Sequence, residues 1–492
     1  KAQKNAIASP ATGLLVFQAA PDSVGFHYYN GTQWIWINPS ASTGNAWNLT
    51  GNAGTDTATN FIGTTDNMPV RFKQNSEWLG QWNKNTGNYL IGEVAGKKIT
   101  SGVDNIGMGD SALNSITTGS RNTAIGSLAM TKSLNGSDNT VLGYNALNAG
   151  TSAFFNTGVG SHALELNTTG DNNVAVGALT LGQNTAGQAN AAIGTLALAT
   201  NTTGIENTAV GSQSMFSNIT GNRNTALGSQ AFFNNLSGAE NTALGTEALY
   251  SNQTGSDNIA VGNGSLNQNL TGNDNIAMGD SSLVNNVSSS NLIAIGRKTL
   301  HTVTNSSNLI AIGDSVLYSN TSGSDNIGIG PKALLRNTSA VRNVAIGSGA
   351  LKTVTTDGYN VAVGTNTLTA STTGYENTAV GDGALEKNTT GYLNNAFGSS
   401  ALGLNTTGHN NTAIGNYALV NNTTGINNVA LGSSAAAFNT TGSSNIALGY
   451  ESLYLNATSS QLIGIGQAAL YNVTASSNLL AIGDSALYQN TS

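Results

Sequence analysis

The residues of this chain that could do chemistry are few and scattered. The four histidines are His27, His162, His301 and His409, and they do not have the spacing of metal ligands. The sequence contains no cysteine, which excludes disulfides and thiolate metal sites. We therefore expect no metal, no cofactor and no catalytic group, and we predict that the protein is not an enzyme.

Several acidic residues lie in turn-forming sequences. Asp138 stands in a Gly-Ser-Asp-Asn segment, and Asp257 and Asp325 have the same setting. Asp supports such turns through bonds to its own backbone, so a structural role is the simplest interpretation. A calcium site stays open as an alternative, although the glycine-rich nonapeptide of calcium-binding β-rolls is missing. The Gly-Lys-Lys at 96–98 lacks the spacing of a phosphate-binding loop.

Composition excludes two further classes of protein. Charged residues are only 8% of the 492 residues, against roughly 25% in typical soluble domains. Lys and Arg total 17 without a run in the sequence, and the net charge is −7, so we expect no nucleic-acid partner. No apolar stretch reaches the roughly 18 residues of a transmembrane helix, so we expect no membrane span.

A glycine recurs every 17 residues from Gly92 to Gly483, giving 24 glycines without a slip. Around most of them the sequence is similar to Asn-Thr-Ala-Ile-Gly-x-x-Ala-Leu, as at Asn122–Met130. A period this short and regular indicates one structural unit copied many times. Frequent Asn-x-Thr/Ser triplets, as at Asn167–Thr169, follow from the repeat, so we expect them to be structural rather than glycan acceptors.

Each unit predicts one coil of a β-solenoid. The Asn-Thr-Ala-Ile segment alternates large and small residues, which is typical of a strand, and Gly, Asn and Thr are poor helix formers. We expect two short strands and two turns in each coil. Coils stacked at the strand spacing of ~4.8 Å would form a rod on the order of 115 Å long. The predicted fold class is all-β: a β-solenoid, or parallel β-roll, of about 24 coils of 17 residues, with a small N-terminal antiparallel β domain.

Stacking turns each repeat position into a column of similar side chains. The residue before each glycine is apolar and the fourth residue after it is usually Leu, and we expect these two columns to form the inner seam. Ala or Gly two residues before the glycine should keep one sheet face flat. Asn four residues before the glycine can form an amide ladder from coil to coil. The residues representing these columns are Gly109, Gly126, Gly228, Gly313, Gly483, Asn122, Asn224, Asn411, Ile125, Ile312, Leu249 and Leu334.

Four units replace the ladder Asn with Leu, at Leu292, Leu309, Leu462 and Leu479. The two pairs are offset by 170 residues, or ten units, which indicates a block duplication. Two interpretations stay open. The exceptions reflect shared ancestry alone, or they form a local apolar patch where the rod meets a neighbour.

The beginning of the chain differs from the repeats. All five tryptophans, Trp34, Trp36, Trp47, Trp78 and Trp82, lie in the first 82 residues. Asn30-Gly31 between two aromatic runs is a strong hairpin signal. We predict an N-terminal β cap or hairpin domain at 1–48, a β connector at 49–87 and the repeat solenoid at 88–492, with the cap covering the exposed end of the stack.

The repeat resembles a known family. The motif at Asn122–Ala129, Asn224–Ala231 and Asn411–Ala418 is similar to the head repeat of YadA-like trimeric adhesins. Those heads are left-handed parallel β-rolls with three chains side by side, and their typical period is shorter than the 17 residues found here. The resemblance covers about residues 88–492 and implies a homotrimer.

The first residues resemble a second group of proteins. Pro10–Phe17, Tyr29–Trp34 and Asn60–Asn67 look like the leading segments of large secreted bacterial fibre proteins, which are similar to phage tail fibres. Many of those proteins end in an intramolecular chaperone domain of the endosialidase type, and no such domain follows the repeats in this sequence. The resemblance implies an extracellular trimeric fibre.

We therefore expect a non-enzymatic structural fibre or adhesin, a rigid extracellular shaft on a cell surface, virion or fibre. Its expected partners are copies of itself and a surface glycan or receptor, bound through many weak contacts. Alternatives are an ice- or glycan-binding solenoid and the shaft of a phage or injection-system tail fibre. Ice binding needs a flat Thr ladder, but this column changes to Ile or Val from Ile259 to Val361. An enzymatic tailspike needs clustered carboxylates, and the repeat supplies none.

Overall fold

The structure is a computed structural model of the chain. It describes residues 4–19, 24–37, 53, 55, 56, 58–474 and 476–490, so Trp47 and the end of the predicted 1–48 domain lie outside the described residues. The chain divides into two compact units, Lys1–Val70 and Arg71–Ser492. In the described part of the chain, no helix has the length and apolar character that a bilayer crossing requires.

The first unit contains a three-stranded antiparallel sheet, as the sequence predicted. A short 3-10 helix, η1 (Lys4–Ala6), precedes β1 (Leu15–Gln18), β2 (Gly25–Tyr29) and β3 (Trp34–Ile37), which pair in this order. The Asn30-Gly31 turn joins β2 to β3, and the Asn30 side-chain oxygen accepts a bond from the Thr32 amide at 3.0 Å. The hairpin prediction is therefore confirmed.

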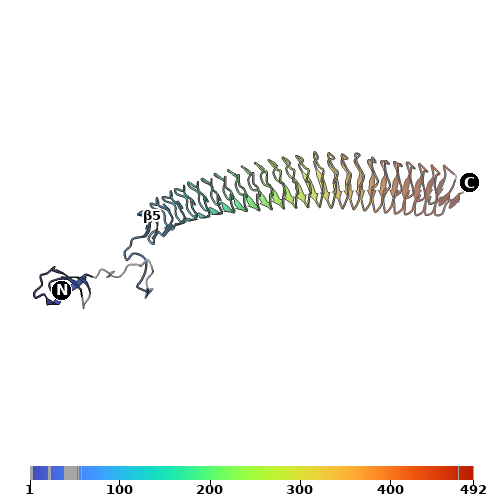
Figure 1. The fold of residues 1–492 in the computed structure, drawn as a ribbon. Helices are drawn as coiled ribbons and strands as arrows, with labels where there is room; N and C mark the ends of the chain where they lie inside the picture. Colours follow the sequence, from blue (N-terminus) through green and yellow to red (C-terminus); the bar gives the residue numbers. More distant parts are fainter. Residues whose placement is uncertain are drawn as a thin grey trace. The chain divides into compact units, whose positions relative to one another are not determined.

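The second unit is a β-solenoid of about 24 coils, which confirms the predicted fold class (Figure 1). It opens with β4 (Val70–Gln74), β5 (Glu77–Asn83) and β6 (Asn88–Ile91). From β6 onward each strand pairs in parallel with the strand one coil later, in register, as Thr225 pairs with Thr242. The other strands of the column are β7 (Ile106–Met108), β8 (Thr123–Ile125), β9 (Thr140–Leu142), β10 (Thr157–Val159), β11 (Val174–Val176), β12 (Ala191–Ile193), β13 (Thr208–Val210), β14 (Thr225–Leu227), β15 (Thr242–Leu244), β16 (Ile259–Val261), β17 (Ile276–Met278), β18 (Leu292–Ile295), β19 (Leu309–Ile312), β20 (Ile327–Ile329), β21 (Val344–Ile346), β22 (Val361–Val363), β23 (Thr378–Val380), β24 (Asn395–Phe397), β25 (Thr412–Ile414), β26 (Val429–Leu431), β27 (Ile446–Leu448), β28 (Ile463–Ile465) and β30 (Leu480–Ile482).

The edge of the first coil is covered by a strand of the same unit. β5 pairs antiparallel with β6, so that Gly80 lies opposite Ile91. Trp78 donates its indole N–H to the Ala95 carbonyl at 3.1 Å. β5 therefore satisfies the strand edge that would otherwise present unpaired backbone groups.

The prediction of two strands in each coil is wrong for nearly all of the described coils. Each contributes one short strand to the column, and only β29 (Asn472–Val473) and β31 (Gln489–Asn490) form a second pair. The reason is backbone conformation. In the coil after Gly126, for example, Leu128, Met130 and Asp138 have φ values of 61°, 51° and 60°. These left-handed residues bend the chain and interrupt any further strand.

The inner seam differs from the prediction in one column. Leu249 and Leu334 are fully buried, as expected, but Ile125 and Ile312, which precede the repeat glycine, are only half-buried. The middle residue of the strand points inward instead, as Ala124 does.

The size of the interior explains this reversal. A methyl group added at Gly158, in the middle of β10, would lie 3.3 Å from the Val141 side chain and 3.6 Å from Leu164. The inward strand column therefore has room for little more than Ala. The larger residue on either side of it must face outward, because neighbouring strand residues point to opposite faces.

The repeat glycine is required for two reasons. Gly228 has φ 142°, which L-residues rarely adopt, and an added Cβ would lie within contact distance of the Gly245 carbonyl oxygen of the next coil. Gly109, Gly126 and Gly313 have the same conformation and the same kind of neighbour. Gly483, with φ 126°, shares the conformation, but its added Cβ would meet nothing closer than Ala486 at 3.9 Å.

This difference gives a matched test of coil stacking. Gly228→Ala should lower the melting temperature clearly, because it combines the unfavourable φ, worth ~1–3 kcal/mol, with a backbone clash. Gly483→Ala carries the unfavourable φ alone and should have the smaller effect. Thermal unfolding followed by circular dichroism would compare the two, and equal losses would contradict the stacking role.

Candidate functional site

The structure leaves the histidines apart from one another. His162 contacts Glu165 at 2.8 Å, while His301 stacks on Tyr318 and His409 stacks on Tyr392. Among the described residues, no group of three His, Asp or Glu side chains is placed to hold a metal ion. The calcium alternative therefore gains no support from the turns that contain Asp138, Asp257 and Asp325.

Of the acidic turn residues, Asp138 and Asp325 face an arginine at the surface, whereas Asp257 lies beside the Glu240 carboxylate. The Arg121 guanidinium donates two bonds to the Asp138 carboxylate, at 2.6 and 2.7 Å, and these bonds lower the pKa of Asp138. At Asp257 desolvation, followed by the charge of Glu240, raises the pKa. Exposed pairs of this kind contribute little to stability.

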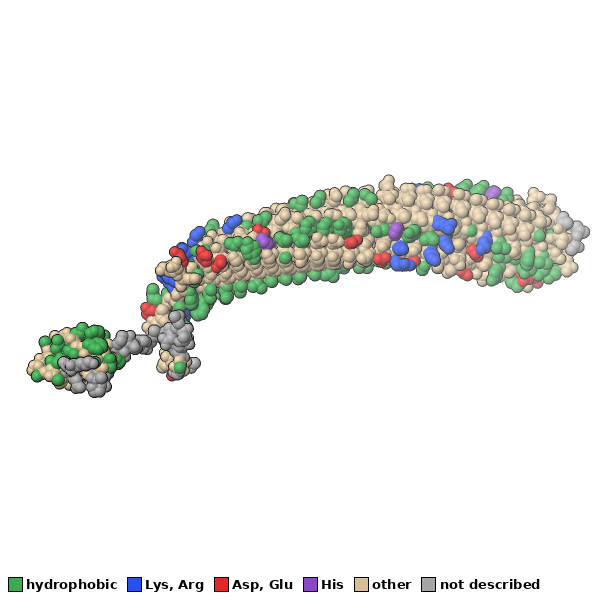
Figure 2. All heavy atoms as spheres, viewed as in Figure 1, with side chains coloured by type: hydrophobic (Ala, Val, Ile, Leu, Met, Phe, Trp, Pro, Cys, Tyr) green, Lys and Arg blue, Asp and Glu red, His purple; other side chains and the backbone are tan. Residues whose placement is uncertain are grey.

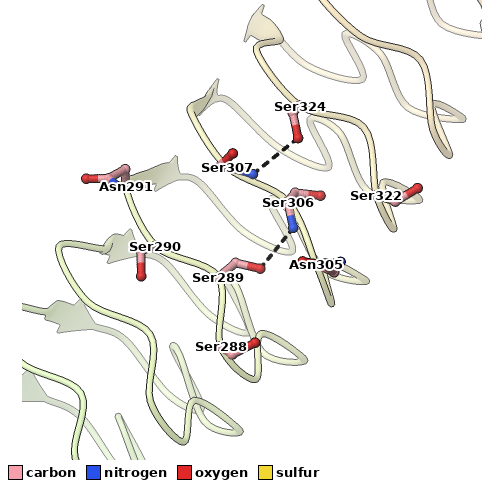
Figure 3. Close-up of a pocket in the computed structure, with 9 residues that line it drawn as sticks. All are labelled: Ser288, Ser289, Ser290, Asn291, Asn305, Ser306, Ser307, Ser322 and Ser324. Carbon is pink, nitrogen blue, oxygen red and sulfur yellow. Dashed lines mark hydrogen bonds between the residues drawn. The ribbon is translucent and has the colours of Figure 1, made fainter.

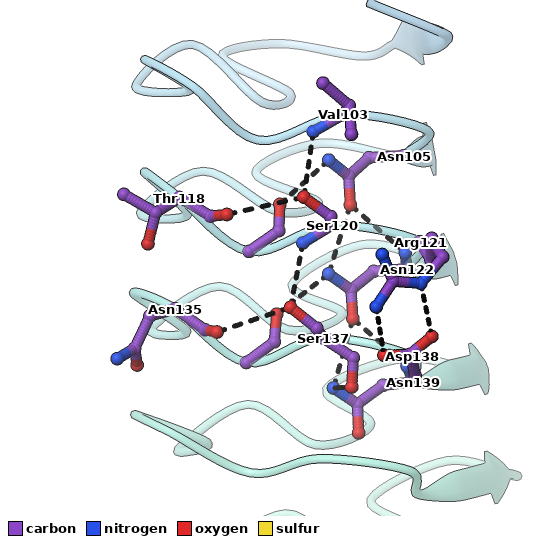
Figure 4. Close-up of polar contacts among 12 residues, drawn as sticks. Val103, Asn105, Thr118, Ser120, Arg121, Asn122, Asn135, Ser137, Asp138 and Asn139 are labelled. Carbon is purple, nitrogen blue, oxygen red and sulfur yellow. Dashed lines mark hydrogen bonds and ion pairs between the residues drawn. The ribbon is translucent and has the colours of Figure 1, made fainter.

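A buried amide ladder runs along the inside of the strand column (Figure 4). The Asn122 amide nitrogen donates to the Asn105 side-chain oxygen at 3.0 Å and to the Gly136 carbonyl at 2.9 Å. Its own side-chain oxygen accepts bonds from the Asn139 backbone and side chain. Asn224 and Asn411 have the equivalent partners. Every ladder Asn therefore joins two coils and fixes a turn.

A second amide ladder was not recognised in the sequence. Asn167 lies in an Asn-Thr-Thr-Gly segment, which predicts only a turn, yet its side chain is fully buried. Its amide donates to the Gly170 carbonyl at 2.8 Å, and Asn184 donates to its oxygen at 2.7 Å. The signal was present, because Asn recurs at this position every 17 residues from Asn167 to Asn286. Burial also removes Asn167 from the reach of a glycosylating enzyme in the folded protein.

The four Leu exceptions lie inside the solenoid. Leu292, Leu309 and Leu462 are fully buried, and Leu479 packs against the core. The interpretation as an apolar surface patch is therefore wrong, because the substituted column is an interior one.

The exception at Leu292 leaves the turn at Ser306 without its usual amide partners. The Ser306 position corresponds to Gly170, whose carbonyl accepts bonds from two ladder amides, Asn156 and Asn167. At Ser306 the equivalent residues are Leu292 and Val303. A recess of about 490 Å³, lined by serines and asparagines that include Ser289, lies on the surface at this turn (Figure 3).

The outer face of the strand column is a long surface that exposes apolar side chains along the second unit. In the three-residue strands the first and third residues point outward, as Thr225 and Leu227 do on either side of the buried Ala226. In the four-residue strands β6, β18 and β19 the second and fourth residues point outward instead. From β6 to β30 none of these outward residues is charged. Their large apolar side chains remain substantially exposed, to 48% at Leu142, 50% at Leu227 and 47% at Leu431. We call this surface the strand face.

The strand face forms one continuous stripe. Because all strands pair in register, the outward side chains line up in two rows along the column. Figure 2 shows part of the stripe as hydrophobic side chains along the lower edge of the solenoid, where Figure 1 places the strands. Soluble monomers rarely expose contiguous apolar patches larger than a few hundred Å². The chemistry available here is apolar association with another flat surface.

One family model matches the chain. Residues 1–53 match the phage tail like trimerisation region. No curated protein matches the sequence. The match and the β-solenoid together fit a phage-tail-fibre-like protein, and the trimerisation region suggests self-assembly into a trimer on a virion or extracellular fibre.

The buried ladder gives a pH-dependent prediction. Asn224→Asp removes an amide donor and buries a carboxyl group beside the Asn207 oxygen, so it should cost about 3 kcal/mol at pH 7. Burial raises the folded-state pKa of such a carboxyl above its unfolded value of about 3.9. The loss should therefore be smallest near pH 4 and grow as the pH rises.

Asn222→Asp is the matched control. The Asn222 side-chain oxygen accepts a bond from the Ile205 backbone amide at 2.8 Å. At the equivalent position three coils earlier the residue is Asp171, whose carboxylate accepts the same bond from Phe154. Its melting temperature should stay close to that of the unmodified protein at both pH values. Similar melting curves for the two variants would contradict the buried ladder.

Proposed function

We propose that this chain forms the shaft of a non-enzymatic trimeric fibre in which three copies pack through their strand faces. The observation that carries the proposal is a stripe of outward residues that is free of charge from β6 to β30. The strand face of a second copy matches this stripe in length and in strand spacing along its whole extent. Closed symmetric assemblies of identical chains are also the common solution for such surfaces.

The match to a trimerisation region supports three as the number of chains in the fibre. It would hold three chains together at one end, so that association of the strand faces becomes intramolecular and proceeds at high effective concentration. Packing would remove the exposed apolar rows from water, and this is the main favourable contribution to association.

In this fibre the solenoid acts mechanically. Its parallel strand pairs and stacked glycines repeat from end to end, and amide ladders join the coils along most of its length, so the shaft resists bending and holds attached regions away from a surface. We propose an extracellular location, which the match to a phage tail like trimerisation region supports, and we propose a receptor-binding role for the fibre.

Single cysteines would test the packing, because the natural chain has none. Leu227→Cys places a thiol on the strand face, and Leu236→Cys places one on a turn with 39% exposure. With a short bis-maleimide, Leu227→Cys should give covalently linked chains on a denaturing gel and Leu236→Cys should not. Absence of linkage at Leu227, or equal linkage at both sites, would contradict packing through the strand face.

A further inference from the structure

Positive charge gathers on one stretch of the solenoid. Residues 297–352 contain six Lys or Arg residues and two Asp residues, in a chain whose net charge is −7. Both acids face an arginine: Asp314 lies 3.0 Å from Arg297, and Asp325 lies 4.0 Å from Arg342. Among the described residues, no ion pair is formed by the four cations that remain, Lys298, Lys332, Arg336 and Lys352.

The repeat register brings three of these cations together. Positions 20 residues apart meet on this face, as Asn145 shows by donating to the Glu165 carboxylate at 2.6 Å. Lys332 and Lys352 have the same separation and the same places in their coils. The Arg336 amide donates to the Lys352 carbonyl at 3.0 Å, which makes these two residues neighbours as well.

Aromatic rings lie next to the cations. His301 and Tyr318 stack with ring centroids 4.8 Å apart and an interplanar angle of 16°. Burial, followed by the nearby charge of Lys298, lowers the pKa of His301, so Lys298 lies close to this pair. Figure 2 shows the group of Lys and Arg side chains on the face in view, beside a histidine. We call Lys298, His301, Tyr318, Lys332, Arg336 and Lys352 the basic patch.

Like charges held side by side repel one another unless an anion lies between them. The stack of coils holds the backbone of Arg336 next to that of Lys352, so the two cationic side chains start from neighbouring positions. Bound carboxylates would relieve it, and Arg336 can bind a carboxylate with two parallel bonds.

We infer that the basic patch binds an acidic polysaccharide, a sugar chain that carries carboxylate groups. The patch extends across consecutive coils, so it suits an extended ligand with spaced charges. The rings of His301 and Tyr318 offer an apolar edge for the uncharged parts of sugar rings. Nucleic acid is a poorer match, because its dense charge requires many cations and the protein as a whole is acidic.

This inference deepens the proposed receptor-binding role. A trimeric shaft would present three basic patches, and simultaneous binding would add avidity to a weak single contact. Binding at one patch needs only one chain, so it can be measured whether or not the trimer forms.

The test uses the full chain and a short oligogalacturonate in low salt, with binding followed by calorimetry. The triple variant Lys332→Gln, Arg336→Gln, Lys352→Gln should bind about tenfold more weakly, or lose binding entirely. The matched control is Lys97→Gln, Lys98→Gln, Lys132→Gln, which removes the same charge from the coils that follow Gly92 and Gly126 and should leave affinity unchanged. Unaltered melting curves would verify that both variants fold.

Several results would overturn the inference. These are absence of binding by the unmodified protein, equal weakening in both variants, or tighter binding of duplex DNA or of vesicles of anionic lipid than of oligogalacturonate. A neutral dextran of similar length should not bind. If the protein has the mass of one chain in solution, the proposed trimer is wrong but the basic patch is not, because calorimetry counts the oligogalacturonate molecules bound to each chain.

Discussion

The spacing between coils is the constraint on which the rest of this structure depends. Each coil must follow the last at the distance of one strand pair, ~4.8 Å. At that distance the backbone at Gly228 comes so close to Gly245 that no side chain fits between them. The same spacing places the oxygen of Asn122 where it accepts bonds from Asn139. A left-handed φ at a residue such as Leu128 costs free energy in an isolated chain. Each coil therefore keeps its conformation only because it packs between the coils before and after it.

Much of this could be predicted from the sequence, because the constraint acts on residue types. The regular glycine predicts the number and length of the coils, and Asn in most units predicts an amide ladder. The Asn30-Gly31 pair predicted the hairpin, and Gly31 has a left-handed φ of 100°, which favours glycine.

What could not be predicted depends on the size of the interior. Alternation of Thr, Ala and Ile shows that two faces exist but does not say which is inside, and the usual assumption places the larger residue inward. Here the inward position of the strand has room for Ala124 but for little more, so Ile125 faces outward. The second ladder was missed because Asn167 occurs in a segment that also favours a turn, and the basic patch arises only when residues 20 apart in sequence meet in space.

The same reversal connects the fold to the proposed function. If the larger apolar residues of each strand faced inward, a single chain would bury them by itself. In this solenoid they are exposed along the whole strand column. Burying that column among three copies is the central claim, and cryo-electron microscopy of the full-length protein tests it most directly. The expected result is a rod of three solenoids with the strand columns facing the threefold axis. Single solenoids, or trimers whose strand columns face the solvent, would contradict it.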